Sequence, residues 1–266
     1  MKSFFNKYKH AVPLIIYFSI YMIWFNHLET TITRYKVIHV ALDDHIPFCE
    51  VFVVPYLLWF VYVAATIAFL FFKDKDDYYK SCAFLFTGMT VFLLISTIAP
   101  NGHHLRPFVM PRNNIFTQLV SHLYSIDTPT NLWPSIHVYN SLGCHFAIMK
   151  SKNLEQHKGI RFGSLILCSS IIMSTVLIKQ HSMFDVMTAF IMAAIMYLLV
   201  YRFDILLNLK HNYNNKKSSA GALDSENASH SHWNDSRCGA DSLIEFKEPL
   251  AEFVSLHGYF SASLTR

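Results

Sequence analysis

The segment VFVVPYLLWFVYVAATIAFLFF, residues 51–72, carries no charged side chain over a length that can cross a lipid bilayer as one helix. The whole chain has the same character. Of its 266 residues, 53% are hydrophobic and 15% are aromatic, which is too apolar for an ordinary soluble domain of this length. The composition therefore indicates an integral membrane protein.

Five further segments approach the roughly 20 apolar residues that a transmembrane helix needs. They are residues 11–28, 82–99, 133–149, 162–178 and 184–201. Together the six segments predict an all-α, polytopic membrane protein, with six transmembrane helices forming a bundle over residues 1–203. Residues 204–266 are polar, rich in Ser, Asn and Lys, and without sustained periodicity. We expect them to form a disordered cytoplasmic tail.

Lysine and arginine residues divide unequally between the two sides of the membrane that six spans define. With the N-terminus inside, the inner segments hold fourteen of them and the outer loops hold five, namely Arg34, Lys36, Arg106, Arg112 and Lys179. Both termini are therefore expected in the cytoplasm. The first segment follows three lysines and lacks a small-residue cleavage pattern, so we interpret it as an uncleaved anchor.

Polar residues gather in three segments that this topology places at the outer face. They are NGHHLRPFVMPRNN (residues 101–114), WPSIH (133–137) and KQHSMFD (179–185). The fourth and sixth spans both begin at this face, and helix N-termini expose free N–H groups with a partial positive charge. With the cations Arg106, Arg112 and Lys179 beside them, these helix ends predict a pocket for an anion such as phosphate.

Taken singly, the residues of these segments have ordinary structural explanations. Pro134 and Ser135 are typical of a helix start, and Ser182 with Asp185 forms a capping-box pattern. His181 and Asp185, however, lie four residues apart and so on one helix face. A carboxylate beside an imidazole fixes its tautomer and stabilises the imidazolium. The pair is therefore also a candidate catalytic unit.

Cysteine and histidine spacings predict no metal centre. The five cysteines show neither a disulfide framework nor a zinc pattern. His103 and His104 are adjacent but have no further ligand at a suitable spacing, and His145 is assigned to helix packing. We predict no metal and no other cofactor.

The spacing of the outer residues resembles the signature blocks of the type 2 phosphatidic acid phosphatase family, which shares its core with the vanadium haloperoxidases. The second block of that family, P-S-x-H, matches PSIH at residues 134–137. The third, S-R-x5-H-x3-D, matches Ser174, His181 and Asp185. The first, K-x6-R-P, matches RP at residues 106–107.

Two positions depart from the family pattern. Ala99 stands in place of the lysine of the first block, and Thr175 in place of the arginine of the third. Both replacements remove a phosphate-binding cation, for which Lys179 and Arg112 are candidate substitutes. The sequence KQH before the final aspartate is similar to a bacterial branch of the family, which implies a bacterial cell membrane.

The resemblance implies a metal-independent phosphatase that acts on a lipid phosphate or pyrophosphate at the extracytoplasmic face. In the family's mechanism His181 would form a phosphohistidine, Asp185 would orient it, and His137 would protonate the leaving oxygen and then activate water. The phosphate oxygens would be held by Arg106, Lys179, Ser135 and Arg112. The expected partners are the lipid bilayer and an amphiphilic substrate, with no nucleic acid.

Two alternatives follow from the same residues. A lipid phosphotransferase would use the same histidine–aspartate core and pass the phosphoryl-containing group to an alcohol. A non-catalytic lipid-binding or transport protein would fit the replacements at Ala99 and Thr175, whereas the retained His137, His181 and Asp185 favour an enzyme.

Overall fold

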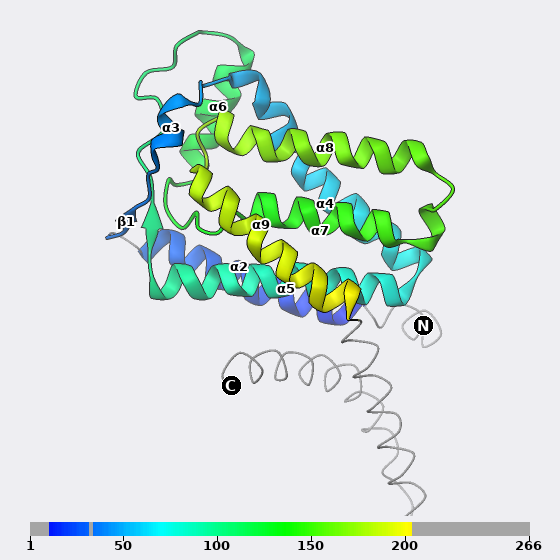
Figure 1. The fold of residues 1–266 in the computed structure, drawn as a ribbon. Coiled ribbons are helices and arrows are strands. Elements are labelled where there is room, and N and C mark those ends of the chain that lie inside the picture. Colours follow the sequence, from blue (N-terminus) through cyan, green and yellow to red (C-terminus); the bar gives the residue numbers. More distant parts are fainter. Residues whose placement is uncertain (1–10, 32–33, 204–266) are drawn as a thin grey trace, which may run out of the picture. The chain divides into compact units, whose positions relative to one another are not determined.

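A computed structural model describes residues 11–31 and 34–203, and this part of the chain is mostly helical (Figure 1). The chain divides into two units, Phe18–Arg202 and a second unit made of Met1–Tyr17 with Phe203–Arg266. The first unit contains nearly all of the described residues and carries everything that follows. The predicted tail, residues 204–266, lies outside the described residues.

The elements follow one another as a series of helices with two very short strands. The helices are α2 (Val12–Thr31), α3 (Ala41–His45), α4 (Val53–Lys73), α5 (Lys75–Ile98), α6 (Ile115–Ile126), α7 (Ile136–Lys150), α8 (Lys158–Leu177) and α9 (Met183–Tyr197). A π-helical turn, Leu198–Arg202, extends α9, and the 3-10 turn η2 (Glu50–Phe52) precedes α4. The strands β1 (Lys36–Val37) and β2 (Asn101–Gly102) pair in parallel.

Each of the six predicted segments overlaps a helix among the described residues, but four helices there are long and apolar enough to cross a membrane, and α2 and α7 are not among them. These four are Glu50–Lys73, Lys75–Ile98, Lys158–Leu177 and Met183–Arg202. Helix α7 has 15 residues, fewer than the roughly 20 that a perpendicular span needs. It contacts α4, α5, α8 and α9, so it is the central helix of the bundle.

Helix α5 begins seven residues before the predicted third segment. The side chain of Asp74 accepts hydrogen bonds from the N–H groups of Asp76 and Asp77, and these two acids lie in the first turn of the helix. An N-cap of this kind with acidic residues beside it stabilises a helix start. Hydropathy marks only the apolar part of a helix, so the polar first turns were not predicted.

Helices α5 and α7 approach each other closely because glycines lie at their interface. A Cβ atom on Gly88 would be 2.0 Å from the ring of Tyr139, and one on Gly143 would be 2.6 Å from the ring of Phe84. The two rings stack with centroids 4.7 Å apart. The Tyr139 hydroxyl donates to the Phe84 carbonyl at 2.8 Å. Small residues permit this close contact between apolar helices.

The polar connections lie together at one end of the bundle. Figure 1 shows α3, α6 and the β1 strand at the end where α8 finishes and α9 starts. A buried cluster of Val53, Tyr56, Val120 and Ile178 joins the first turn of α4 to α6 and to the end of α8. This end of the bundle carries all of the predicted site residues.

Candidate active site

The three predicted polar segments come together at this end of the bundle. The rings of His137, in the first turn of α7, and His181, just before α9, have centroids 5.7 Å apart. The N–H of Ser135 donates to the Asp185 carbonyl at 3.3 Å and joins the two helix starts. His103, from the loop after β2, bonds the Gln180 carbonyl at 2.9 Å. The predicted convergence is therefore observed, while the catalytic roles of these residues stay predictions.

Asp185 is part of the helix cap of α9 and also lies beside His181. Its Oδ2 accepts the N–H of Ser182 at 2.9 Å and lies 3.4 Å from Nδ1 of His181. Both side chains are buried. Among the described residues, neither His181 Nδ1 nor Asp185 Oδ1 has a hydrogen-bond partner. The capping explanation and the catalytic one are thus compatible, because a small rotation would let the second carboxylate oxygen accept from the imidazole.

Two aromatic rings of α4 fix the plane of the His137 imidazole. Tyr56 stacks on it with centroids 4.5 Å apart, and Trp59 lies at 4.3 Å. Within the described part of the chain, the buried Nδ1 of His137 and the buried indole N–H of Trp59 have no hydrogen-bond partner. Buried polar groups are normally paired, so these atoms are candidates for contact with a ligand.

The turn between α8 and α9 sets the position of His181. Gln180 N–H donates to the Thr175 carbonyl and Lys179 N–H to the Val176 carbonyl, which is the Schellman arrangement of a helix C-terminus. His181 N–H donates to the same Thr175 carbonyl at 2.9 Å. Lys179 occupies the left-handed position with φ 53°, where glycine or asparagine is usual. The backbone thus holds His181 directly against the end of α8.

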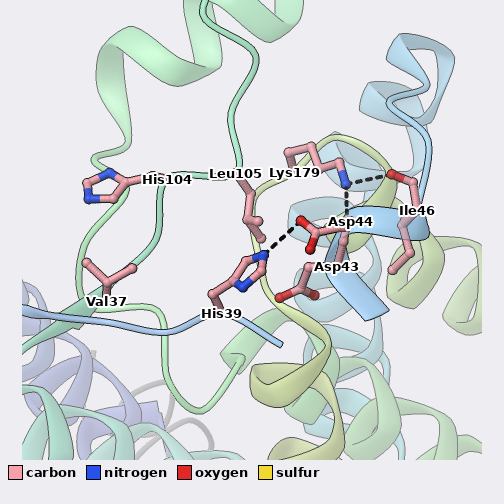
Figure 2. A pocket seen from close by; sticks show the side chains of 8 residues that line it. All are labelled: Val37, His39, Asp43, Asp44, Ile46, His104, Leu105 and Lys179. Atoms are coloured by element: carbon pink, nitrogen blue, oxygen red, sulfur yellow. Dashed lines mark hydrogen bonds and ion pairs between the residues drawn. The ribbon is translucent and has the colours of Figure 1, made fainter. Parts of the chain in front are cut away.

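Lys179 is directed to α3 and the residues after it, as Figure 2 shows. Its Nζ donates to the carbonyls of Asp43 at 2.8 Å and Ile46 at 2.6 Å. Burial lowers the pKa of Lys179, against the opposing charges of Asp43 and Asp44. The lysine lines a pocket of about 450 Å³ whose other lining residues are Val37, His39, Asp43, Asp44, Ile46, His104 and Leu105. Neither catalytic candidate histidine lines this pocket, and the lysine's two bonds stabilise its strained backbone.

Asp43 is a buried carboxylate that the sequence reasoning missed. Its Oδ2 accepts from the Ser182 hydroxyl at 2.6 Å and from Val40 N–H at 3.0 Å, and its Oδ1 accepts from Met183 N–H at 2.8 Å. It therefore caps the N-terminus of α9 from a distant part of the chain. Asp185 accepts a further N–H group of the same terminus. The first N–H groups of α9 are thus bonded to protein acceptors rather than left open for an anion.

Arg106 is a predicted phosphate-binding cation that is linked to His181 through a hydrogen bond to the preceding residue, Gln180. Its guanidinium donates to the carbonyls of Tyr124 and Asp127 and to the side chain of Gln180, the residue before His181. The guanidinium also lies 4.4 Å from the centre of the Tyr124 ring. Burial lowers the pKa of Arg106, and the Asp127 charge acts in the opposite direction. Its Nε has no partner among the described residues.

Gln180 and Asp127 complete the network around Arg106. The Gln180 amide donates to Asp127 Oδ2 at 3.0 Å while its oxygen accepts from Arg106. Burial raises the pKa of Asp127, and the charges of Arg106 and His181 oppose this shift. A carboxylate here lowers the positive potential around Arg106, and spacing did not reveal it because Asp127 lies 54 positions before His181.

His103 is held as a neutral imidazole. Its Nδ1 accepts from Leu105 N–H at 3.2 Å, so the proton is on Nε2, which donates to the Gln180 carbonyl. Burial lowers the pKa of His103 to about 4. His103 therefore supports the turn before His181 and adds no positive charge near neutral pH.

The remaining predicted phosphate ligands have protein partners. Arg112 Nη1 bonds both carboxylate oxygens of Glu50 at 2.9 and 2.8 Å, so its charge is paired. Ser135 is the N-cap of α7, where its hydroxyl oxygen accepts from Val138 N–H at 3.4 Å. We therefore leave Arg112, Lys179 and Ser135 out of the phosphate-binding set proposed below.

The two positions that depart from the family pattern are structural in this chain. Ala99 is the C-cap of α5. The buried Thr175 hydroxyl donates to the Ile172 carbonyl at 2.8 Å, while its carbonyl supports the turn to α9. Neither side chain supplies a cation, and the two candidate substitutes, Arg112 and Lys179, are bonded to Glu50 and to the Asp43 and Ile46 carbonyls.

Comparisons with known proteins add no relative: no protein-family model, no curated protein and no solved structure matches the chain. The site is therefore interpreted from its own geometry.

Proposed function

We propose that the chain is a membrane-embedded phosphatase that hydrolyses a lipid phosphate or pyrophosphate through a phosphohistidine intermediate. The observation that carries the proposal is the pair of imidazoles, His137 and His181, with centroids 5.7 Å apart and a buried aspartate beside one of them. Two imidazoles this close together can act on one phosphoryl group, one as nucleophile and the other as general acid and base.

The proposed topology has six spans with both termini in the cytoplasm of a bacterial cell. Support comes from the four long apolar helices and from the excess of Lys and Arg in the sequence segments that this topology assigns to the cytoplasmic side. The central helix α7 would be screened from lipid by its neighbours. The site would then lie at the extracytoplasmic membrane boundary.

In the proposed reaction, Nε2 of His181 attacks phosphorus because Nδ1 faces Asp185. The new N–P bond forms as the bond from phosphorus to the leaving oxygen breaks, and His137 donates a proton to that oxygen. His137 then takes a proton from water, whose oxygen displaces the histidine and releases inorganic phosphate. Asp185 stabilises the positive charge that His181 gains in the first step and loses again in the second.

Arg106 and Trp59 are the proposed donors to the phosphate oxygens. A guanidinium has five N–H donors, and Arg106 uses three of them in bonds to the protein, so Nε–H and one other remain. The Trp59 indole N–H is buried beside His137 without a partner among the described residues. These donors would stabilise the charge that develops in the transition state.

The test is release of inorganic phosphate by the purified full chain from lipid phosphates and pyrophosphates in mixed micelles. His181→Ala and His137→Ala are expected to abolish release without changing membrane insertion, and vanadate is expected to inhibit the unaltered protein. The matched control is His104→Ala, because His104 is exposed and lies outside the pair. Full activity of His181→Ala would refute the nucleophile. Transfer of the group to an added alcohol in preference to water would indicate the phosphotransferase instead.

A further inference from the structure

The loop between β2 and α6 exposes large apolar side chains at its tip. Phe108 is fully exposed and Val109 is 75% exposed, and both lie between Pro107 and Pro111. Apolar area in water is unfavourable by roughly 25 cal/mol per Å². Contiguous exposed apolar side chains usually mark a contact surface.

Helix α6 continues this exposed surface. Its inner stripe, which includes Phe116, Val120 and Leu123, packs on the buried cluster at the end of the bundle. A second apolar stripe is exposed and consists of Ile115, Leu119 and Ile126. At about 100° per residue these three fall within roughly 40° of one another on the helix circumference. The polar residues Gln118, Ser121 and Ser125 occupy the other side.

The base of this segment is fixed at the level where α4 begins. Arg112 and Asn114 both bond Glu50, the first residue of the apolar segment Glu50–Lys73. Asn114 is also the N-cap of α6. The first turns of the apolar segment expose Val51 and Val54. The exposed stripe of α6 therefore starts at the same depth as the exposed apolar surface of a helix that can cross a membrane.

We propose that the Phe108–Val109 tip and the outer stripe of α6 insert into the outer leaflet of the bilayer, at the boundary between headgroups and acyl chains. The occupant of this surface is lipid because the surface continues that of α4, whose exposed side chains stay apolar through Leu58 and Val61. A helix with one apolar side and one polar side lies in this plane, about 5–10 Å below the headgroup surface. The same segment supplies Arg106 and Tyr124 to the candidate site, so its depth fixes where that site meets the membrane.

The test is depth-dependent fluorescence quenching on the full chain in phosphatidylcholine–phosphatidylglycerol vesicles. A small fluorescent amino acid is introduced singly at Phe108, at Leu119 or at the control position Ser121 on the polar side of α6. Lipids brominated in the acyl chains quench from inside the bilayer, and aqueous iodide quenches from outside. Quenching by bromolipid is expected to be roughly twofold or more stronger at 108 and 119 than at 121, with the reverse order for iodide.

Equal quenching at the three positions by both agents would overturn the proposal, since the stripe would then lie in water. Protection of positions 108 and 119 from both quenchers would overturn it as well, because another protein surface would then cover the stripe. The measurement does not depend on phosphatase activity, so a failed activity assay and a failed insertion assay are distinguishable.

Discussion

Asp43→Ala is expected to lower the free energy of unfolding strongly, because the Asp43 carboxylate is buried and holds the start of α9. The carboxylate is 1% exposed and accepts three hydrogen bonds, two of them from Ser182 and Met183 at the start of α9. Each buried donor that loses its partner costs about 1–3 kcal/mol. Since two such donors remain at the helix start, we expect a loss of about 4 kcal/mol in the free energy of unfolding.

The assay is the fraction of detergent-solubilised full chain that stays monodisperse after heating. For a protein of this size, 1 kcal/mol corresponds to about 2–4 °C, so Asp43→Ala should lower the midpoint by about 10 °C. Asp43→Asn keeps one acceptor oxygen and should lose about half as much. The matched control is Asp44→Ala, whose side chain is 64% exposed and forms an ion pair with His39. An exposed ion pair contributes about 0–1 kcal/mol, so this variant should melt within about 3 °C of the unaltered chain.

Equal midpoint temperatures for Asp43→Ala and Asp44→Ala would refute this reasoning, because the Asp43 carboxylate would then not stabilise the start of α9. Phosphate release provides a second readout, because Ser182 is adjacent to His181. Under the proposed function, Asp43→Ala should lose activity at temperatures where it is still folded, whereas Asp44→Ala should retain it.

Two further predictions concern helix packing and pH. In the same melting assay, Gly88→Ala should lower the free energy of unfolding by about 1–3 kcal/mol, because its methyl group would overlap the Tyr139 ring. The control Gly163→Ala should be neutral or slightly stabilising, because nothing lies within 4 Å of the added Cβ atom. Equal midpoint temperatures for the two variants would contradict this prediction. For His103, the folded pKa of about 4 lies below the unfolded value near 6.5, so its contribution to stability is complete above pH 6.5 and falls as pH drops toward 4. The loss should approach about 3 kcal/mol at pH 4 in the melting assay, and His103→Asn should flatten this part of the pH profile; an unchanged profile would contradict the assignment.

Hydropathy predicted where the helices lie but not how far each one extends. Segment 51–72 corresponds to α4, Val53–Lys73, because apolar residues fill that helix from end to end. Segment 82–99 missed the first turns of α5, which are stabilised by the Asp74 cap rather than by burial in lipid. The short α7 was predicted as a span from its composition, yet its 15 residues depend on four surrounding helices. Helix length is set by caps and neighbours, which a sliding average does not include.

For the candidate site, residue spacing along the chain predicted the contacts between residues that are close in sequence. His181 and Asp185 are one helical turn apart, and the pairing of His137 with them required only a common membrane face. Spacing did not reveal Asp43, Tyr56 or Asp127, because their contacts to the site cross more than 50 positions of the chain. A tyrosine in an apolar span or an aspartate in a polar loop has no local feature that distinguishes it from its neighbours.

The positions of lysine and arginine in the sequence also did not reveal which of these side chains could bind a phosphate. Lys179 is bonded to two carbonyls near α3, and Arg112 to Glu50. The N-terminus of α9 has Asp43 and Asp185 as its acceptors. These contacts neutralise or occupy most of the positive groups that the sequence had placed in the site.

What remains is a site with one partly available guanidinium, at Arg106, and Asp127 close beside it in the same network. A dianionic phosphate would meet less compensating charge there than in a pocket built from two or three free cations, since each such contact is a strong charge-assisted hydrogen bond. A substrate with an alkyl chain would gain binding energy from apolar burial among the helices, independent of that charge. Under the proposed function, the sparse charge of the site therefore favours an amphiphilic phosphate over a small soluble one, and the phosphate-release assay measures this discrimination when a soluble phosphate ester is compared with the lipid substrates.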